Sequence, residues 1–181
     1  MRTALRLSFA LLALGLPGLA AATTVTVTGV DGMTSTIFQH NQSSFSGLGA
    51  RMRLDTGVAG LELMPGMEYW RNSTTLQIYE IKSQRRDATL GVDARYRFSV
   101  KGWSPYLGAG FGIHFLSSQV SSPPLGVPET NHSIMKGGIA VLGGLNFPIA
   151  GAFESFLEAK YHLVSDYEQL KVSWGLAYNI P

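Results

Sequence analysis

The stretch that decides the fold is KVSWGLAYNI, residues 171–180. Its side chains alternate between two faces, which is the period of a β-strand. One face is bulky and apolar and the other is small or polar: Val172, Trp174, Leu176, Tyr178 and Ile180 against Lys171, Ser173, Gly175, Ala177 and Asn179. A soluble sheet would bury the bulky face in a core, whereas a transmembrane barrel turns it to lipid and points the polar face inward. The rest of the chain favours the membrane.

The first 22 residues have the order of a secretory signal. Arg2 and Arg6 accompany an apolar run at residues 7–16, which is followed by a Pro17-Gly18 break and three alanines at 20–22. Such signals are removed on export, and the run is shorter than the ~20 residues that a spanning helix needs. We therefore expect a signal peptide at residues 1–22 and an outer-membrane β-barrel domain at residues 23–181.

The composition of the expected mature chain excludes several classes of protein. Loss of Arg2 and Arg6 leaves 12 basic residues against 12 acidic ones, so we expect no nucleic-acid partner. The chain has no cysteine, so neither disulfides nor a lipid-anchored cysteine is expected. After the leader, no apolar run reaches the length of a spanning helix. Contact with a membrane would therefore be made by strands.

Seven further segments show a strand pattern. Residues 23–40 form an irregular first strand that Gly29, Asp31 and Gly32 interrupt with a bulge or break. Pro65 lacks an N–H for the ladder, so a bulge is expected there as well. The expected strands before the last one are residues 23–40, 46–55, 60–70, 90–98, 105–115, 136–147 and 153–163.

The connections between these segments alternate in length. Turns at Asp55, Lys101 and Pro148 are short, whereas residues 71–86 and 117–133 are interpreted as long polar loops, the first of which allows strand extensions around residues 76–81. Short periplasmic turns and longer outer loops are typical of outer-membrane barrels. The sequence thus predicts an all-β protein, an eight-stranded antiparallel up-and-down transmembrane β-barrel with a charged, glycine-rich interior and both termini in the periplasm.

Charges of both signs occupy the minor face of the strands. They are Arg51, Arg53, Glu62, Glu68, Asp93, Arg95, Arg97, Lys136, Glu154, Glu158, Lys160 and Lys171. An eight-stranded barrel is just wide enough for side chains to fill it, so these residues are expected to form an interior network beside glycines such as Gly110 and Gly144. A one-residue slip of strand 90–98 would move its charges into lipid, at roughly 2 to 4 kcal/mol for each basic residue at the midplane.

Two motifs resemble those of a known family. Residues 158–162, EAKYH, and 173–180, SWGLAYNI, look like the last two strands of the small outer-membrane beta-barrel domain family, the eight-stranded barrels similar to OmpA and OmpX. The resemblance implies that Ser173, Gly175, Tyr178 and Ile180 form a C-terminal signal read by the barrel-insertion machinery. The chain departs from the family in ending on Ile180-Pro181, where many members end on an aromatic residue.

Candidate catalytic and metal-binding residues are sparse. The four histidines, at 40, 114, 132 and 162, show no short metal-ligand spacing, so no metal or cofactor is expected. His162, Ser165 and Glu158 are the one trio similar to a lipid A deacylase triad. However, His162 and Ser165 are an odd number of residues apart and would point to opposite faces of a strand.

The favoured function is a non-enzymatic outer-membrane barrel with a structural or surface-interaction role. Its partners would be outer-membrane lipid, the insertion machinery during assembly and an unidentified extracellular ligand of loops 71–86 and 117–133. The protein is expected to be monomeric. The alternatives are a periplasmic, lipocalin-like ligand-binding barrel, in which the charges face water and the aromatic face is the core, and a lipid A-modifying outer-membrane enzyme.

Overall fold

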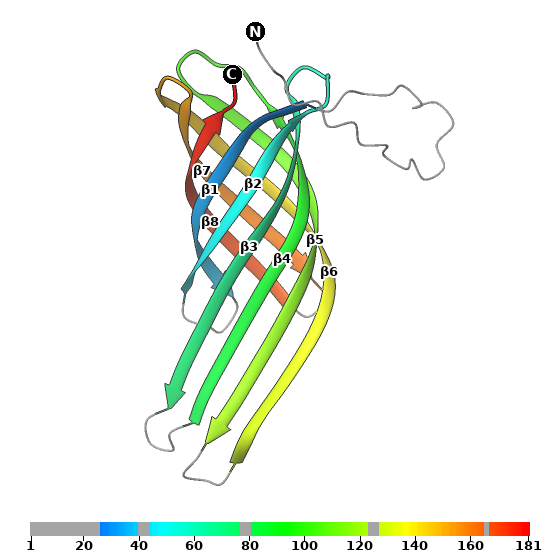
Figure 1. Ribbon diagram of the computed structural model, residues 1–181, viewed down its shortest axis with the longest axis vertical. Helices are drawn as coiled ribbons and strands as arrows, with labels where there is room; N and C mark the ends of the chain where they lie inside the picture. Colours follow the sequence, from blue (N-terminus) through cyan, green and yellow to red (C-terminus); the bar gives the residue numbers. More distant parts are fainter. Residues whose placement is uncertain (1–25, 40–43, 77–80, 123–126, 165–166) are drawn as a thin grey trace, which may run out of the picture.

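The described residues form eight antiparallel strands that close into a barrel (Figure 1). A computed structural model describes residues 26–39, 44–76, 81–122, 127–164 and 167–181. Each strand pairs with the next, and the last pairs with the first, so the predicted up-and-down barrel is confirmed. The strands are β1 (Thr26–Gln39), β2 (Phe45–Asp55), β3 (Leu61–Leu76), β4 (Ile81–Arg97), β5 (Ser104–Ser122), β6 (Val127–Ala150), β7 (Phe153–Val164) and β8 (Tyr167–Asn179).

The bulky face of the strands points outward, away from the lumen. Leu48, Met67, Leu107 and Trp174 are all more than half exposed, whereas the buried apolar cluster inside consists of Met33, Phe156 and Ala177. A soluble barrel would show the opposite arrangement, so this is the orientation of a transmembrane barrel. In the described part of the chain, no helix is long and apolar enough to cross a membrane. The expected signal peptide lies outside the described residues.

The first strand is more regular than the sequence suggested. A register shift between Val27 and Gly29 agrees with the expected bulge, but pairing with β8 then runs without interruption from Gly29 to Gln39. Asp31 continues the strand instead of breaking it, because its side chain is buried inside the barrel. By contrast, the bulge expected at Pro65 is absent. The β2–β3 register is the same on both sides of Pro65, and the ladder merely lacks pairs there.

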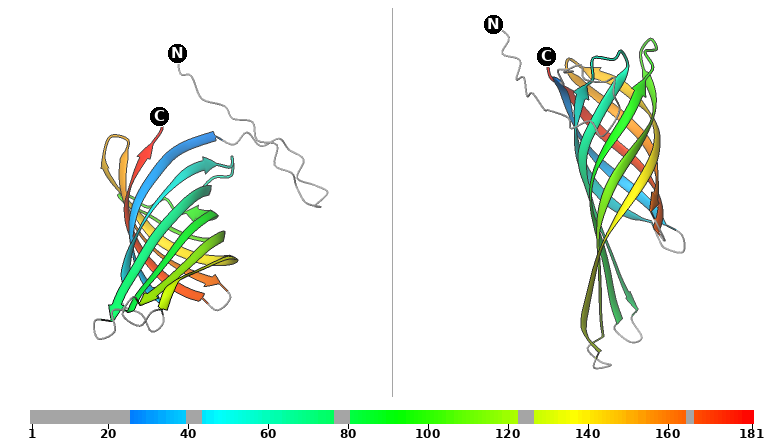
Figure 2. Two further views of the ribbon diagram at one scale, coloured as in Figure 1. Left: turned by 60° about the horizontal axis from the view of Figure 1, so that its bottom comes forward. Right: turned by 90° about the vertical axis from the view of Figure 1, so that its right-hand side faces the viewer.

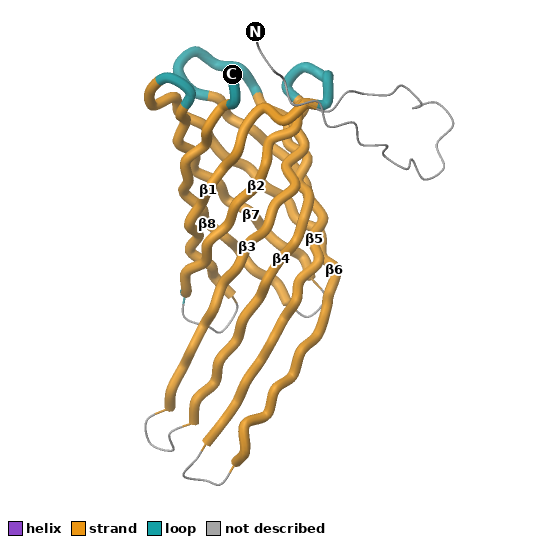
Figure 3. The backbone as a smooth tube through the Cα atoms, viewed as in Figure 1, coloured by secondary structure: helices purple, strands orange, loops and turns teal. Residues whose placement is uncertain are grey.

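The two long loops predicted at residues 71–86 and 117–133 are largely strand. Arg71–Leu76 pairs with Ile81–Arg86, and β5 pairs with β6 as far as Ser122 and Val127. Residues 77–80 and 123–126 lie outside the described residues. Figures 1 and 3 show these four strands continuing beyond the others at the end opposite the termini. The right-hand view in Figure 2 shows the same extension from the side.

We call this extension the projecting sheet (residues 71–76, 81–86, 117–122 and 127–133). The pairing of β2 with β3 stops at Trp70, and that of β6 with β7 starts at Gly138. Within the described residues, neither edge of the projecting sheet therefore pairs with a further strand. We call the end of the barrel where β1 begins and β8 ends the terminal end, and the opposite end the far end.

Candidate functional site

A row of glycines makes room for the interior charges. Gly66, Gly91, Gly112 and Gly138 are aligned side by side across β3, β4, β5 and β6. The same register row begins at Ala177 on β8 and returns to that strand at Tyr167, ten residues away along the chain. Strand number and stagger together set the width of a barrel. In this narrow lumen, wall positions without side chains allow long side chains from the other strands to cross.

Gly144 shows how tightly this space is used. A Cβ at Gly144 would lie 2.5 Å from the hydroxyl oxygen of Tyr106. We expect Gly144→Ala to lower the free energy of unfolding by about 1 to 3 kcal/mol, as overpacking of a full core does. Gly137 lies next to Gly138 on the outward face of β6, and its Cβ would make only ordinary contact with Phe111 at 3.7 Å. Denaturant unfolding in vesicles should therefore show no loss for Gly137→Ala, and equal losses would contradict this account of the interior.

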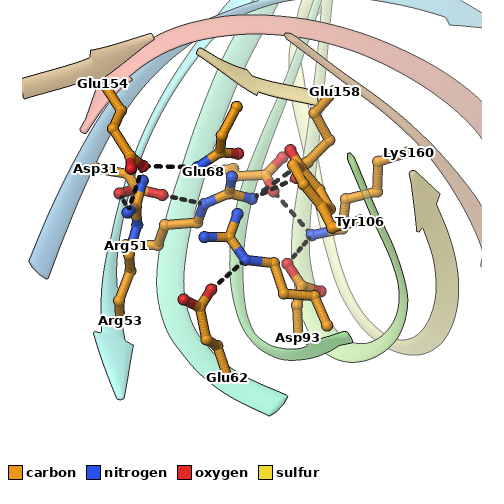
Figure 4. Close-up of polar contacts among 12 residues, drawn as sticks. Asp31, Arg51, Arg53, Glu62, Glu68, Asp93, Tyr106, Glu154, Glu158 and Lys160 are labelled. Carbon is orange, nitrogen blue, oxygen red and sulfur yellow. Dashed lines mark hydrogen bonds and ion pairs between the residues drawn. The ribbon is translucent and has the colours of Figure 1, made fainter. Parts of the chain in front are cut away.

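The centre of the interior network is Arg51 on β2. Its Nη1 donates to both carboxylate oxygens of Glu158, at 2.8 and 2.9 Å, and its Nε donates to Asp31 Oδ2 at 3.0 Å. Tyr106 donates its hydroxyl to Glu158 at 2.9 Å. All four side chains are buried, and Figure 4 shows them meeting in the lumen. A carboxylate held by a guanidinium and a phenol is strongly fixed in position.

The same network continues to the terminal end. Arg53 Nε lies 2.6 Å from Asp31 Oδ1, and its Nη1 lies 3.1 Å from Glu154 Oε2. Glu154 also accepts from Arg97 at 2.5 Å. On the opposite wall, Arg95 Nε contacts Glu62 at 2.6 Å, and Glu62 is 3.7 Å from Arg97. Each of the four arginines in this network therefore has an acidic partner. Their four positive charges equal the four negative charges of Asp31, Glu62, Glu154 and Glu158. A cavity of about 580 Å³ opens at this end beside Arg53, Glu62 and Arg97.

A second, smaller network lies nearer the far end. Lys160 Nζ contacts Asp93 Oδ2 at 2.7 Å and Glu68 Oε1 at 3.1 Å, and Lys171 Nζ contacts Glu68 Oε2 at 2.5 Å. Two lysines thus neutralise two carboxylates. The cavity between the two networks has a volume of about 20 Å³, which is room for about one water molecule.

A layer of buried side chains closes the lumen at the far end. Ile37 and Trp70 pack over Gly47, and His114 lies edge-on to His162 with ring centroids 5.2 Å apart. His114 Nδ1 is 2.8 Å from Asp87 Oδ2 and 3.0 Å from Thr89 Oγ1. These side chains and Gln169 are buried. The lumen is thus open at the terminal end and filled by side chains at the far end.

The predicted interior charges can now be placed. Eleven of them make ion pairs inside the barrel: Arg51, Arg53, Glu62, Glu68, Asp93, Arg95, Arg97, Glu154, Glu158, Lys160 and Lys171. Lys136 is half-buried near the far end and aligned with His114.

The sequence analysis missed several interior residues. The sequence predicts a bulge or break at Asp31, although its alternation with Met33 and Ser35 is a usable signal for an inward-facing strand residue. Asp87 falls just after the predicted loop at residues 71–86. Tyr106 and Asn146 are not singled out by the sequence, yet Tyr106 donates to Glu158 and Asn146 donates to Glu154, both at 2.9 Å.

The histidines are less scattered than their spacing suggested. The register brings His114 and His162 together, and His132 lies in the projecting sheet. His40 and Ser165 lie outside the described residues. Among the side chains that the structure describes, no group of three or more His, Asp or Glu residues could hold a metal ion.

The C-terminal residues divide between the two faces of β8. Ser173 and Gly175 face the lumen, where Ser173 Oγ lies 2.7 Å from Ser35 Oγ. Tyr178 faces outward near the terminal end, and its ring centroid lies 5.2 Å from that of Phe153. The backbone N–H of Ile180 donates to Thr28 on β1 at 2.8 Å. The terminal strand thus closes the sheet by pairing with β1.

Comparison with known proteins identifies the fold. No protein-family model matches the sequence, and no curated protein matches it either. The structure is similar to that of Neisserial surface protein A, with 16% identity and a TM-score of 0.58 over 86% of this chain and 99% of that one. Ail of Yersinia pestis, in complex with the heparin analogue sucrose octasulfate, gives 16% identity and a TM-score of 0.58 over 86% and 98%.

A third solved structure gives the same result. The N-terminal β-barrel domain of Pseudomonas aeruginosa OprF shows 13% identity and a TM-score of 0.57, over 85% of this chain and 98% of that one. At these identities the likeness is one of fold. The chain has the fold of the small eight-stranded outer-membrane barrels, as the C-terminal motifs indicated.

Proposed function

We propose that this chain is a non-enzymatic outer-membrane barrel that is closed to solutes and displays the projecting sheet at the cell surface. The observation that carries the proposal is the distribution of side chains, with a bulky apolar belt outside and a neutral, filled interior. The far end would face outward and the terminal end the periplasm, after removal of a leader at residues 1–22. The contact surface would then be the projecting sheet, in place of the two predicted loops.

The interior supports closure rather than transport. The arginine and lysine networks cross the lumen, and the layer around Ile37, Trp70 and His114 fills the far end. Aqueous channels are formed by barrels of ~16 strands, whereas eight-stranded barrels are filled by their own side chains. The charged side chains of both networks are paired with one another, which favours a structural role over catalysis.

A single preparation can test both parts of the proposal. Purified protein folded into vesicles should migrate differently on gels before and after boiling, as a stable membrane barrel does. The same folded protein should give no large, steady conductance in planar bilayers, with a sixteen-stranded porin as the positive control. A protein that remains in the soluble fraction would contradict the membrane barrel. Porin-sized steady openings from heat-modifiable protein would contradict closure alone.

A further inference from the structure

The outward face of β3–β6 changes from apolar to polar along one register row. Tyr69, Ala88, Phe115 and Met135 are aligned across the four strands and exposed to the outside. The next outward row toward the far end consists of Arg71, Arg86, Ser117 and Ser133. Apolar outward residues of a transmembrane barrel mark the hydrocarbon layer. Arg71 and Arg86 therefore lie where the hydrocarbon ends and the lipid headgroups begin.

These two arginines are an unfavourable pair in the absence of an anion. Arg71 on β3 and Arg86 on β4 are directly opposite each other on one face, and both side chains are exposed. Like charges in this position destabilise an antiparallel pair. Arg71 Nη2 donates to Gln84 Oε1 at 3.0 Å, which holds the guanidinium on the outward surface. Lys82 lies on the same face, and among the side chains described on this face of the projecting sheet none is acidic.

We propose that Arg71 and Arg86 bind a phosphate of a phosphorylated glycolipid in the outer leaflet. This inference rests on the proposed function, because it requires an outer membrane around the barrel. A guanidinium presents a planar fork of donors that matches phosphate oxygens. The next outward row carries Ser73, Gln84, Gln119 and Asn131, whose hydroxyl and amide groups suit sugar hydroxyls. The occupant is a lipid because the arginines sit directly above the apolar row and face the surrounding bilayer.

The test uses folded, heat-modifiable protein in phosphatidylcholine nanodiscs, titrated with diphosphoryl lipid A. Arg71→Gln and Arg86→Gln should each weaken binding about fivefold, as expected for one basic side chain at a membrane surface. The double variant should weaken binding about 25-fold if the two effects add. Lys101→Gln is the matched control, because Lys101 is an exposed cation in the β4–β5 turn at the terminal end. It should leave the affinity unchanged.

Three further arms decide the outcome. Wild-type protein should bind dephosphorylated lipid A as weakly as the double variant binds the phosphorylated form. Equal binding of lipid A by the wild type and the double variant would overturn the proposal. A loss of affinity in Lys101→Gln as large as that in Arg71→Gln or Arg86→Gln would also overturn it. If the double variant keeps its affinity for lipid A but loses affinity for heparin, the occupant is a soluble polyanion and the proposal is wrong. Because heat modification is checked first, failure of the barrel itself is distinguished from failure of this site.

Discussion

Replacing Glu158 with Gln should lower the free energy of unfolding by about 3 kcal/mol, the lower end of the range for breaking a buried ion pair. Glu158 is buried, accepts two hydrogen bonds from Arg51, and accepts a third from Tyr106. Glutamine keeps the size of the side chain but removes its charge, so Arg51 retains only Asp31 as an acidic partner. Denaturant-induced unfolding of the protein in lipid vesicles would measure the loss.

Glu168→Gln provides the matched control for this substitution. Glu168 makes the same kind of contact, accepting a hydrogen bond from Tyr161 at 2.6 Å, but it is exposed. Exposed pairs contribute about 0 to 1 kcal/mol, so the control should unfold close to the wild-type midpoint. The double variant Arg51→Gln with Glu158→Gln should lose less stability than the two single variants added together, since neither partner is then left alone. Strict additivity would show that the two side chains act independently.

The fold could be predicted because alternation is strong wherever one face of a strand meets lipid and the other meets the lumen. Residues 105–115 and 171–180 carry this signal in full. The projecting sheet is not predicted because both of its faces lie outside the hydrocarbon layer, so Ser73, Thr75 and Gln119 give no alternation although their backbone ladder continues. Hydrogen bonding of the backbone, unlike burial, leaves little trace in the order of polar residues.

The interior shows a similar limit to prediction from sequence. Alternation placed Arg51 and Glu158 on the inward face, but their partnership spans the lumen, and they are 107 residues apart in the chain. Such partners depend on the stagger of the whole barrel, because each strand is shifted along the axis relative to its neighbour. Asp31 was missed for a local reason, since flanking Gly29 and Gly32 imitate a turn. His114 and His162 meet through the same stagger.

Changing Tyr178 to Asp should reduce the amount of folded protein in the outer membrane to a small fraction of the wild-type amount, with cleavage of the leader unchanged. Tyr178 lies on the strand that closes the barrel, opposite Val30 of β1 and Phe153 of β7. Each unpaired backbone group left in lipid costs several kcal/mol, so the terminal strand must pair correctly during insertion. The amphipathic ring also suits the membrane interface. The heat-modifiable fraction in isolated outer membranes measures the effect.

Tyr96→Asp separates recognition by the insertion machinery from simple contact with lipid. Tyr96 is on the outward face of β4 near the terminal end, is similarly exposed, and packs against Phe98 much as Tyr178 packs against Phe153. A carboxylate near the interface costs only about 1 kcal/mol or less, so Tyr96→Asp should still assemble, and replacement of Pro181 by Phe should be tolerated. If Tyr178→Asp and Tyr96→Asp assemble equally well, β8 carries no special signal at Tyr178, and insertion depends on the barrel as a whole.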